Sequence, residues 1–113
     1  MPQDSGKASP NKRKLTGGPA KIAIENVNHP GSTTQVDAAK YQAMKHAFLR
    51  VLPAAGPGIL AREIQLAVLA HLPDDLFLKG ATAGWWSKAV QLDLEAKGLV
   101  IREKTKPLRW RRA

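Results

Sequence analysis

The sequence contains no cysteine, which excludes disulfide bonds and thiolate ligands for a metal. Aromatic residues are scarce, so each of the three tryptophans is expected to contribute strongly to a modest core. No apolar run approaches the roughly 20 residues that a membrane-spanning helix needs, and no run of signal-peptide length follows the basic N-terminus. We therefore expect a cytoplasmic protein that does not contact a membrane.

Residue patterns that support catalysis are also missing. The three histidines, His29, His46 and His71, fall in different predicted elements, so they do not have the spacing of a metal site. Asp74 and Asp75 follow a predicted helix directly, which favours a turn over an acid–base pair. Neither a Gly-rich phosphate loop nor a nucleophile elbow is present. We expect a protein that is not an enzyme and that uses no metal and no cofactor.

The net charge of +9 is concentrated at the two ends of the chain. Residues 97–113 hold seven basic residues and one acidic residue, and residues 1–21 hold five and one. The middle of the chain, residues 22–96, holds six basic and seven acidic residues. Cations gathered in this way suit a polyanion, because neutralising its phosphates releases condensed counterions. The alternative is that the basic ends serve solubility alone.

Residues 1–21 are rich in Ser, Gly, Pro, Asn and Lys and have hardly any bulky apolar side chains. Such a segment buries too little surface to offset the entropy of ordering it, so we predict a disordered basic tail. Residues 22–113 are predicted to form one domain. The tail cations Lys12, Arg13 and Lys14 are candidates for an electrostatic arm or a nuclear-import patch, and the alternative is an unstructured tail with neither role.

The first half of the domain is predicted to contain a weak strand and a helix. Residues 21–27 alternate apolar and polar side chains, and residues 28–31 follow as a turn. The helix is predicted to start near Thr34, with Asp37 as its capping-box partner, and to end at Pro53. Its buried stripe has helical spacing and consists of Tyr41, Met44, Phe48 and Leu52.

Two further helices are predicted, over about residues 59–71 and 83–97. The buried side of the earlier one consists of Leu60, Ile64, Ala67, Val68 and Leu72. In the later one, the helical period places on the buried side Trp85, Ala89, Leu92 and Ala96. The opposite side consists of Ser87, Lys88, Gln91 and Glu95. Trp86 lies at the margin of the buried side, so the tryptophan pair is predicted to belong to the core rather than to a ligand site. Gly98 follows where a left-handed C-cap is expected.

After Gly98 the chain is predicted to form an antiparallel hairpin, with strands over residues 99–102 and 108–111. The side chains expected to point inward are Leu99, Ile101, Leu108 and Trp110. Period two then leaves Arg102, Arg109 and Arg111 outside.

Two segments resemble the winged helix-turn-helix superfamily: residues 61–64 (AREI) and residues 89–100 (AVQLDLEAKGLV), which lead from a helix into the hairpin. The resemblance covers about residues 34–112. It implies a fold that is mainly α with a β-hairpin, a three-helix winged helix-turn-helix domain. About ten residues, 73–82, separate the second and third helices, where the superfamily has a turn of about three or four. This departure weighs against base reading more than against binding of a nucleic-acid backbone.

Residues 25–31 (ENVNHPG) and 84–86 (GWW) are similar to segments shared by a small group of uncharacterised bacterial proteins. That resemblance covers nearly everything after residue 21, and it implies a winged-helix domain without implying an activity. The polar residues Asn26, Asn28 and His29 either cap the backbone of a turn or line a small pocket.

The hairpin carries the strongest candidate site in the sequence. Six cations within eleven residues are predicted to contact phosphates or a minor groove: Arg102, Lys104, Lys106, Arg109, Arg111 and Arg112. An edge strand guarded against aggregation also carries charge, although one or two charges normally suffice. On the third helix, Ser87, Lys88 and Gln91 are candidate base-reading residues, or they form only its solvated face.

The leading hypothesis is a small bacterial protein, a transcriptional regulator or nucleoid-associated protein, that binds duplex DNA through the hairpin and the tail. The alternative is a winged-helix module for protein–protein interaction, with residues 76–78 (LFL) or the Trp86 margin as its apolar contact. A third hypothesis is RNA binding by the tail. The chain is expected to be a monomer or a homodimer.

Overall fold

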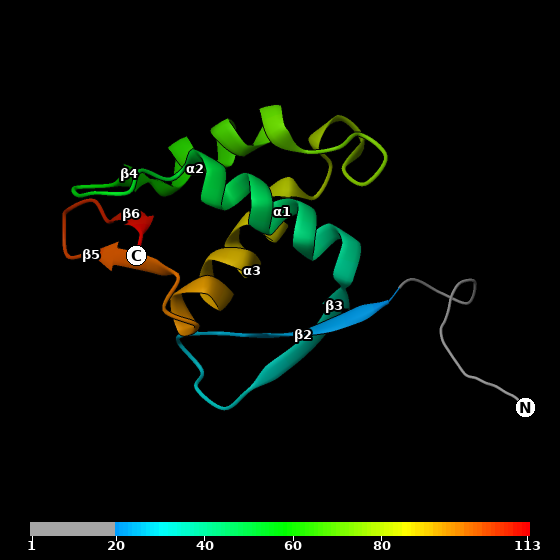
Figure 1. The fold of residues 1–113 in the computed structure, drawn as a ribbon, viewed down its shortest axis with the longest axis horizontal. Helices are drawn as coiled ribbons and strands as arrows, with labels where there is room; N and C mark the ends of the chain where they lie inside the picture. The colour runs from blue at the N-terminus through cyan, green and yellow to red at the C-terminus, as the bar shows by residue number, and fades with distance from the viewer. Residues whose placement is uncertain (1–19) are drawn as a thin grey trace, which may run out of the picture.

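The computed structural model describes residues 20–113, which form three helices and two separate antiparallel sheets (Figure 1). The N-terminal sheet pairs β2 (Lys21–Glu25) with β3 (Thr33–Asp37). The helices are α1 (Ala38–Val51), α2 (Ala61–Val68) and α3 (Ala83–Ala96). The 3-10 turns η1 (Leu69–His71) and η2 (Leu78–Gly80) lie between α2 and α3. The C-terminal sheet contains β4 (Ile59–Leu60), β5 (Val100–Glu103) and β6 (Arg109–Arg112).

This is a mixed α/β fold, so the prediction of a mainly α winged-helix domain with one β-hairpin is wrong. The N-terminal sheet is the larger difference, because the segment predicted to begin the first helix is strand β3. Helix α1 begins four residues later than Thr34, and its N-cap is Asp37, whose carboxylate accepts a hydrogen bond from the Lys40 N–H at 2.9 Å. The sheet buries Ile24 and Val36 against the helices.

The C-terminal sheet has the order β4–β6–β5, so the predicted hairpin exists but gains a third strand. Trp110 of β6 lies opposite Ile59 on one side and opposite Arg102 on the other. Residues directly opposite in an antiparallel pair share a face, so Arg102 lies on the buried Trp110 face and not outside, as predicted. Leu99 and Leu108, predicted to point inward, are each 42% exposed.

Helix α3 packs with a different face from the predicted one. Trp86 is 7% exposed and Trp85 is 57% exposed, so the helix is rotated by about one residue, or roughly 100°, relative to the prediction. The reason is that α3 buries polar side chains: Ser87 and Gln91 are each 3% exposed and Asp93 is fully buried. Hydropathy alone assigns such positions to solvent.

Asp93 connects the N-terminal sheet to two helices. Its carboxylate accepts hydrogen bonds from the Glu25 backbone N–H at 2.8 Å, from the Tyr41 hydroxyl of α1 at 2.5 Å, and from the Lys97 ammonium at 2.5 Å. The pKa of the Tyr41 hydroxyl is raised above its usual range, mainly because the group is buried and also because it donates a hydrogen bond to Asp93. The Val27 N–H also donates to the Leu92 carbonyl at 3.3 Å, so the end of β2 is fixed against α3.

Candidate functional site

Two of the six predicted phosphate-binding cations are neutralised inside the fold. Arg102 pairs with Glu95, whose side chain is only 6% exposed, with Nε–Oε1 at 2.9 Å. Arg111 pairs with Glu103 across the hairpin at 2.5 Å. The charge on each of these arginines is already balanced by a carboxylate, so the two are poor candidates for phosphate contacts.

Glu95 holds a polar network between α3 and the C-terminal sheet. Besides Arg102, its carboxylate accepts hydrogen bonds from Gln91 Nε2 at 3.1 Å and from the Trp110 indole N–H at 3.2 Å. The Arg102 guanidinium also lies 5.8 Å from the centre of the Trp110 ring. Arg102, Gln91 and Trp110 therefore have structural roles, and Trp110 covers the inner face of the hairpin as predicted.

The other four cations of the predicted set form what we call the hairpin cations: Lys104, Lys106, Arg109 and Arg112. None of them has a carboxylate within ion-pair distance among residues 20–113. Lys104 and Lys106 are exposed in the loop between β5 and β6. Arg109 donates to the Gly58 carbonyl at 3.3 Å, and Arg112 donates to the Leu52 carbonyl at 3.1 Å. Carbonyl partners position a guanidinium without neutralising it.

The predicted base-reading residues do not form an exposed surface. Ser87 and Gln91 are buried, and only Lys88 is exposed. A buried side chain cannot reach the edge of a base in a groove, so α3 does not present the predicted set. The predicted tail cations, Lys12, Arg13 and Lys14, lie outside the described residues.

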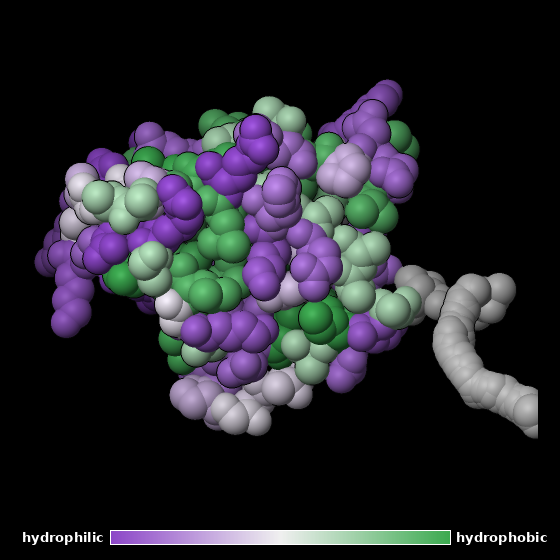
Figure 2. All heavy atoms as spheres, viewed as in Figure 1, coloured by the Kyte–Doolittle hydropathy of each residue, from purple (hydrophilic) through white to green (hydrophobic). Residues whose placement is uncertain are grey.

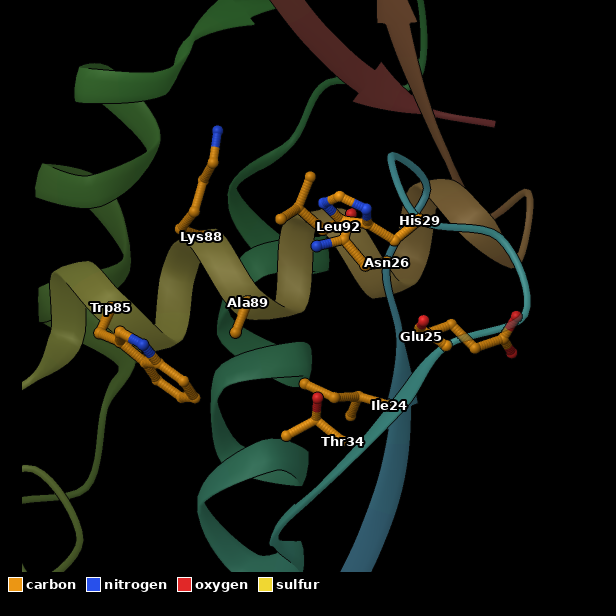
Figure 3. A pocket seen from close by; sticks show the side chains of 10 residues that line it. Ile24, Glu25, Asn26, His29, Thr34, Trp85, Lys88, Ala89 and Leu92 are labelled. Atoms are coloured by element: carbon orange, nitrogen blue, oxygen red, sulfur yellow. The ribbon is translucent and has the colours of Figure 1, made fainter.

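A cavity of about 390 Å³ lies between the β2–β3 hairpin and α3 (Figure 3). It brings together two segments that are about sixty residues apart in the sequence, one containing Asn26 and His29 and the other containing Trp85. The lining consists of Ile24, Glu25, Asn26, His29, Ser32, Thr34, Trp85, Lys88, Ala89 and Leu92. Each alternative for the polar cluster holds in part: Asn26 and His29 line the cavity but Asn28 does not, and Asn26 Oδ1 caps the turn by accepting from the Asn28 N–H at 2.8 Å.

Sequence reasoning placed Trp85 in the core and therefore missed it as a cavity residue. Both sequence motifs, residues 25–31 and residues 84–86, contribute side chains to this cavity, so their occurrence in one chain is the sequence signal that could have indicated it. Within residues 20–113, no three His, Asp or Glu side chains are grouped so that they could hold a metal ion. In the same range, every helix is too short or too polar to cross a membrane.

Comparison with known proteins gives a family but no function. No curated protein matches the sequence, and no solved structure matches it. The model of a protein family of unknown function, DUF6958, matches residues 21–110, which is most of the chain. The chain therefore belongs to the DUF6958 family.

Proposed function

We propose that this protein binds duplex DNA in the cytoplasm by contacting phosphates with the hairpin cations. The observation that carries the proposal is the absence of carboxylate partners for all four of these side chains among residues 20–113. Figure 2 shows hydrophilic side chains that project from the end of the molecule where Figure 1 places the β5–β6 loop. An unpaired cation keeps its charge for an external anion, and a duplex supplies one phosphate charge for every ~1.7 Å of its axis.

The spacing of these cations suits contact with more than one phosphate. Lys104, Lys106 and Arg109 surround the β5–β6 loop. Arg112 lies at the far end of β6, about 10 Å along the strand and on the opposite face of the sheet from Arg109. The burial of Ser87 and Gln91 removes two of the three predicted readers of base edges. Phosphate contacts fix the orientation of a protein but carry no sequence information, so binding independent of sequence is proposed.

The double substitution Lys104→Gln with Lys106→Gln tests the site. Each phosphate contact raises the affinity at ~0.1 M salt about 8-fold over its value at ~1 M salt, where released counterions no longer favour binding. Losing two contacts should therefore weaken duplex binding at ~0.1 M salt by about 60-fold. Fluorescence anisotropy with a labelled duplex of arbitrary sequence measures the affinity.

The matched control is Lys21→Gln with Lys79→Gln, which removes the same charge from exposed positions on β2 and η2. The control should lose far less affinity than the hairpin variant. Equal losses in the two variants would mean that the basic residues act through net charge alone, and the hairpin site would be rejected. Competition with RNA distinguishes a duplex-DNA site from general polyanion binding.

Protein docking is the second candidate, and exposed leucines favour it. Leu66 is 72% exposed, Leu69 43% and Leu78 66%. Two of the four predicted docking residues are internal, because Phe77 is 1% exposed and Trp86 is 7% exposed, whereas Leu78 is exposed. A partner that remains bound after nuclease treatment and in high salt, and that is lost on Leu66→Glu, would favour docking over DNA binding.

A further inference from the structure

We propose that the cavity between the β2–β3 hairpin and α3 binds a small planar aromatic anion. The ring of this ligand lies against Trp85, and the Lys88 side chain, which Figure 3 shows pointing away from Trp85, turns toward its carboxylate or phosphate. The inference is independent of DNA binding, since none of the hairpin cations lines the cavity.

The size and shape of the cavity fit a small molecule. Its volume of about 390 Å³ falls within the range of ~300–1,000 Å³ that is typical of ligand sites. Ala89 and Leu92 of α3 and Ile24 of β2 supply apolar surface, and Figure 3 shows Trp85 at one end of it. A flat ring between these groups would remove apolar surface from water on both of its faces.

Trp85 is held as a rigid aromatic wall. Its indole is 57% exposed, yet it packs edge-on against Trp86, with ring centres 5.1 Å apart and planes at 81°. Trp86 in turn packs edge-on against the buried Phe77, with ring centres 6.3 Å apart. The indole is therefore supported from behind and open toward the cavity, which is the arrangement that stacking with an aromatic ligand requires.

The polar groups around the cavity favour an anion. Lys88 is exposed and has no carboxylate within ion-pair distance among residues 20–113. Figure 3 shows the Glu25 carboxylate pointing away from α3, so it does not neutralise Lys88. Asn26 and His29 add side-chain nitrogens to the rim.

The rim is built before any ligand arrives. The His29 N–H donates to the Asn26 carbonyl at 2.9 Å, and Asn26 Oδ1 is occupied by the Asn28 N–H. Among residues 20–113 the Asn26 amide nitrogen has no hydrogen-bond partner, so it can donate to a ligand. Asp93 fixes the Glu25 backbone to α3, so the two walls keep their separation. A preformed site avoids the entropy cost of ordering loops on binding.

Two pairs of probes test the proposal with the full chain. Indole-3-acetate carries a carboxylate and adenosine monophosphate carries a phosphate, and their neutral counterparts are indole-3-acetamide and adenosine. The indole N–H signals of the three tryptophans are followed by ¹H–¹⁵N NMR, and Trp85→Ala identifies the signal of Trp85 by its disappearance. At least one anion should shift that signal and should bind 5-fold or more tightly than its neutral counterpart, an expected difference of about 1 kcal/mol.

The variants separate the aromatic contact from the charge contact. Trp85→Ala, in which binding is followed by the remaining N–H signals of the same spectra, should abolish binding. Lys88→Gln should leave the anion and its neutral counterpart with equal affinity. Leu66→Ala, at an exposed leucine of α2, is the control and should bind as the wild type does. Failure of both anions to shift the Trp85 signal at about 10 mM, where even weak ligands occupy a site, would overturn the proposal. Equal wild-type affinity for both members of each pair would overturn it as well.

Discussion

Replacing Asp93 with alanine is expected to lower the free energy of unfolding by about 2–6 kcal/mol. The substitution leaves the buried Tyr41 hydroxyl and the Glu25 N–H without their acceptor, and each orphaned donor costs about 1–3 kcal/mol. The Lys97 ammonium is one-third exposed, so water can replace its lost partner. Since small domains are stable by only ~5–15 kcal/mol, this loss is a large fraction of the total.

Urea denaturation followed by circular dichroism measures the effect. Asp75→Ala removes an exposed carboxylate and should change the stability by no more than about 0.5 kcal/mol. Tyr41→Phe removes only the hydroxyl that donates to Asp93 and leaves the carboxylate in place. Its loss of stability should therefore lie between those of Asp93→Ala and Asp75→Ala. If Asp93→Ala proves as stable as Asp75→Ala, then Asp93 does not hold the N-terminal sheet on the helices.

Gly58→Ala is expected to destabilise the fold by about 2–5 kcal/mol. Gly58 has a φ of +86°, which costs other residues about 1–2 kcal/mol. A Cβ there would also lie 2.4 Å from the Trp110 carbonyl oxygen, which belongs to the backbone of the central strand β6. Because a backbone atom cannot rotate aside, β4 and β6 must separate, and overpacking of this kind adds about 1–3 kcal/mol.

Gly98→Ala is a matched control for that prediction. Gly98 has a similar φ of +76°, but no atom lies within 4 Å of the position that a Cβ would take. It should therefore cost only the conformational part, about 1–2 kcal/mol. Thermal unfolding of both variants separates the cost of the positive φ from the cost of the steric clash. Equal losses of stability at the two glycines would show that the clash between a Cβ at position 58 and the Trp110 backbone does not destabilise the fold.

The sequence was most informative where a local signal is strong. The limits of α3 and its left-handed cap at Gly98 agree with the prediction, because glycine is the residue that ends a helix at low cost in this conformation. The buried stripe of α1, with Tyr41, Met44 and Phe48, also agrees with it. The antiparallel pairing of the last two strands is confirmed too.

The sequence was least informative where long-range contacts decide the structure. Strand β3 was predicted as the start of a helix, because its pairing with β2 is a tertiary contact that leaves little trace in five residues. Strand β4 has two residues, too few to show a period. The buried face of α3 was misjudged because Asp93 and Gln91 find their hydrogen-bond partners only in the folded chain.

The candidate sites also combine features that the sequence reveals with contacts that only the folded chain makes. The positive charge of the hairpin could be counted from the sequence, but its pairing could not, because Glu95 reaches Arg102 only when α3 packs on the sheet. Trp85 joins Asn26 in one cavity through the packing of β2 on α3, and no local pattern reports that contact.

The salt dependence of duplex binding tests the central claim, phosphate contact by the hairpin cations, most directly. Affinity is measured between about 50 and 200 mM salt for the wild type and for Lys104→Gln with Lys106→Gln. Four contacts give a slope of about −3.6 in log affinity against log salt, an affinity loss of about 150-fold over this range, and the variant should lose about 1.8 from the slope. Any contacts made by residues 1–19 add equally to both proteins, so the difference isolates the hairpin. A flat wild-type dependence, or equal slopes for the two proteins, would contradict the account.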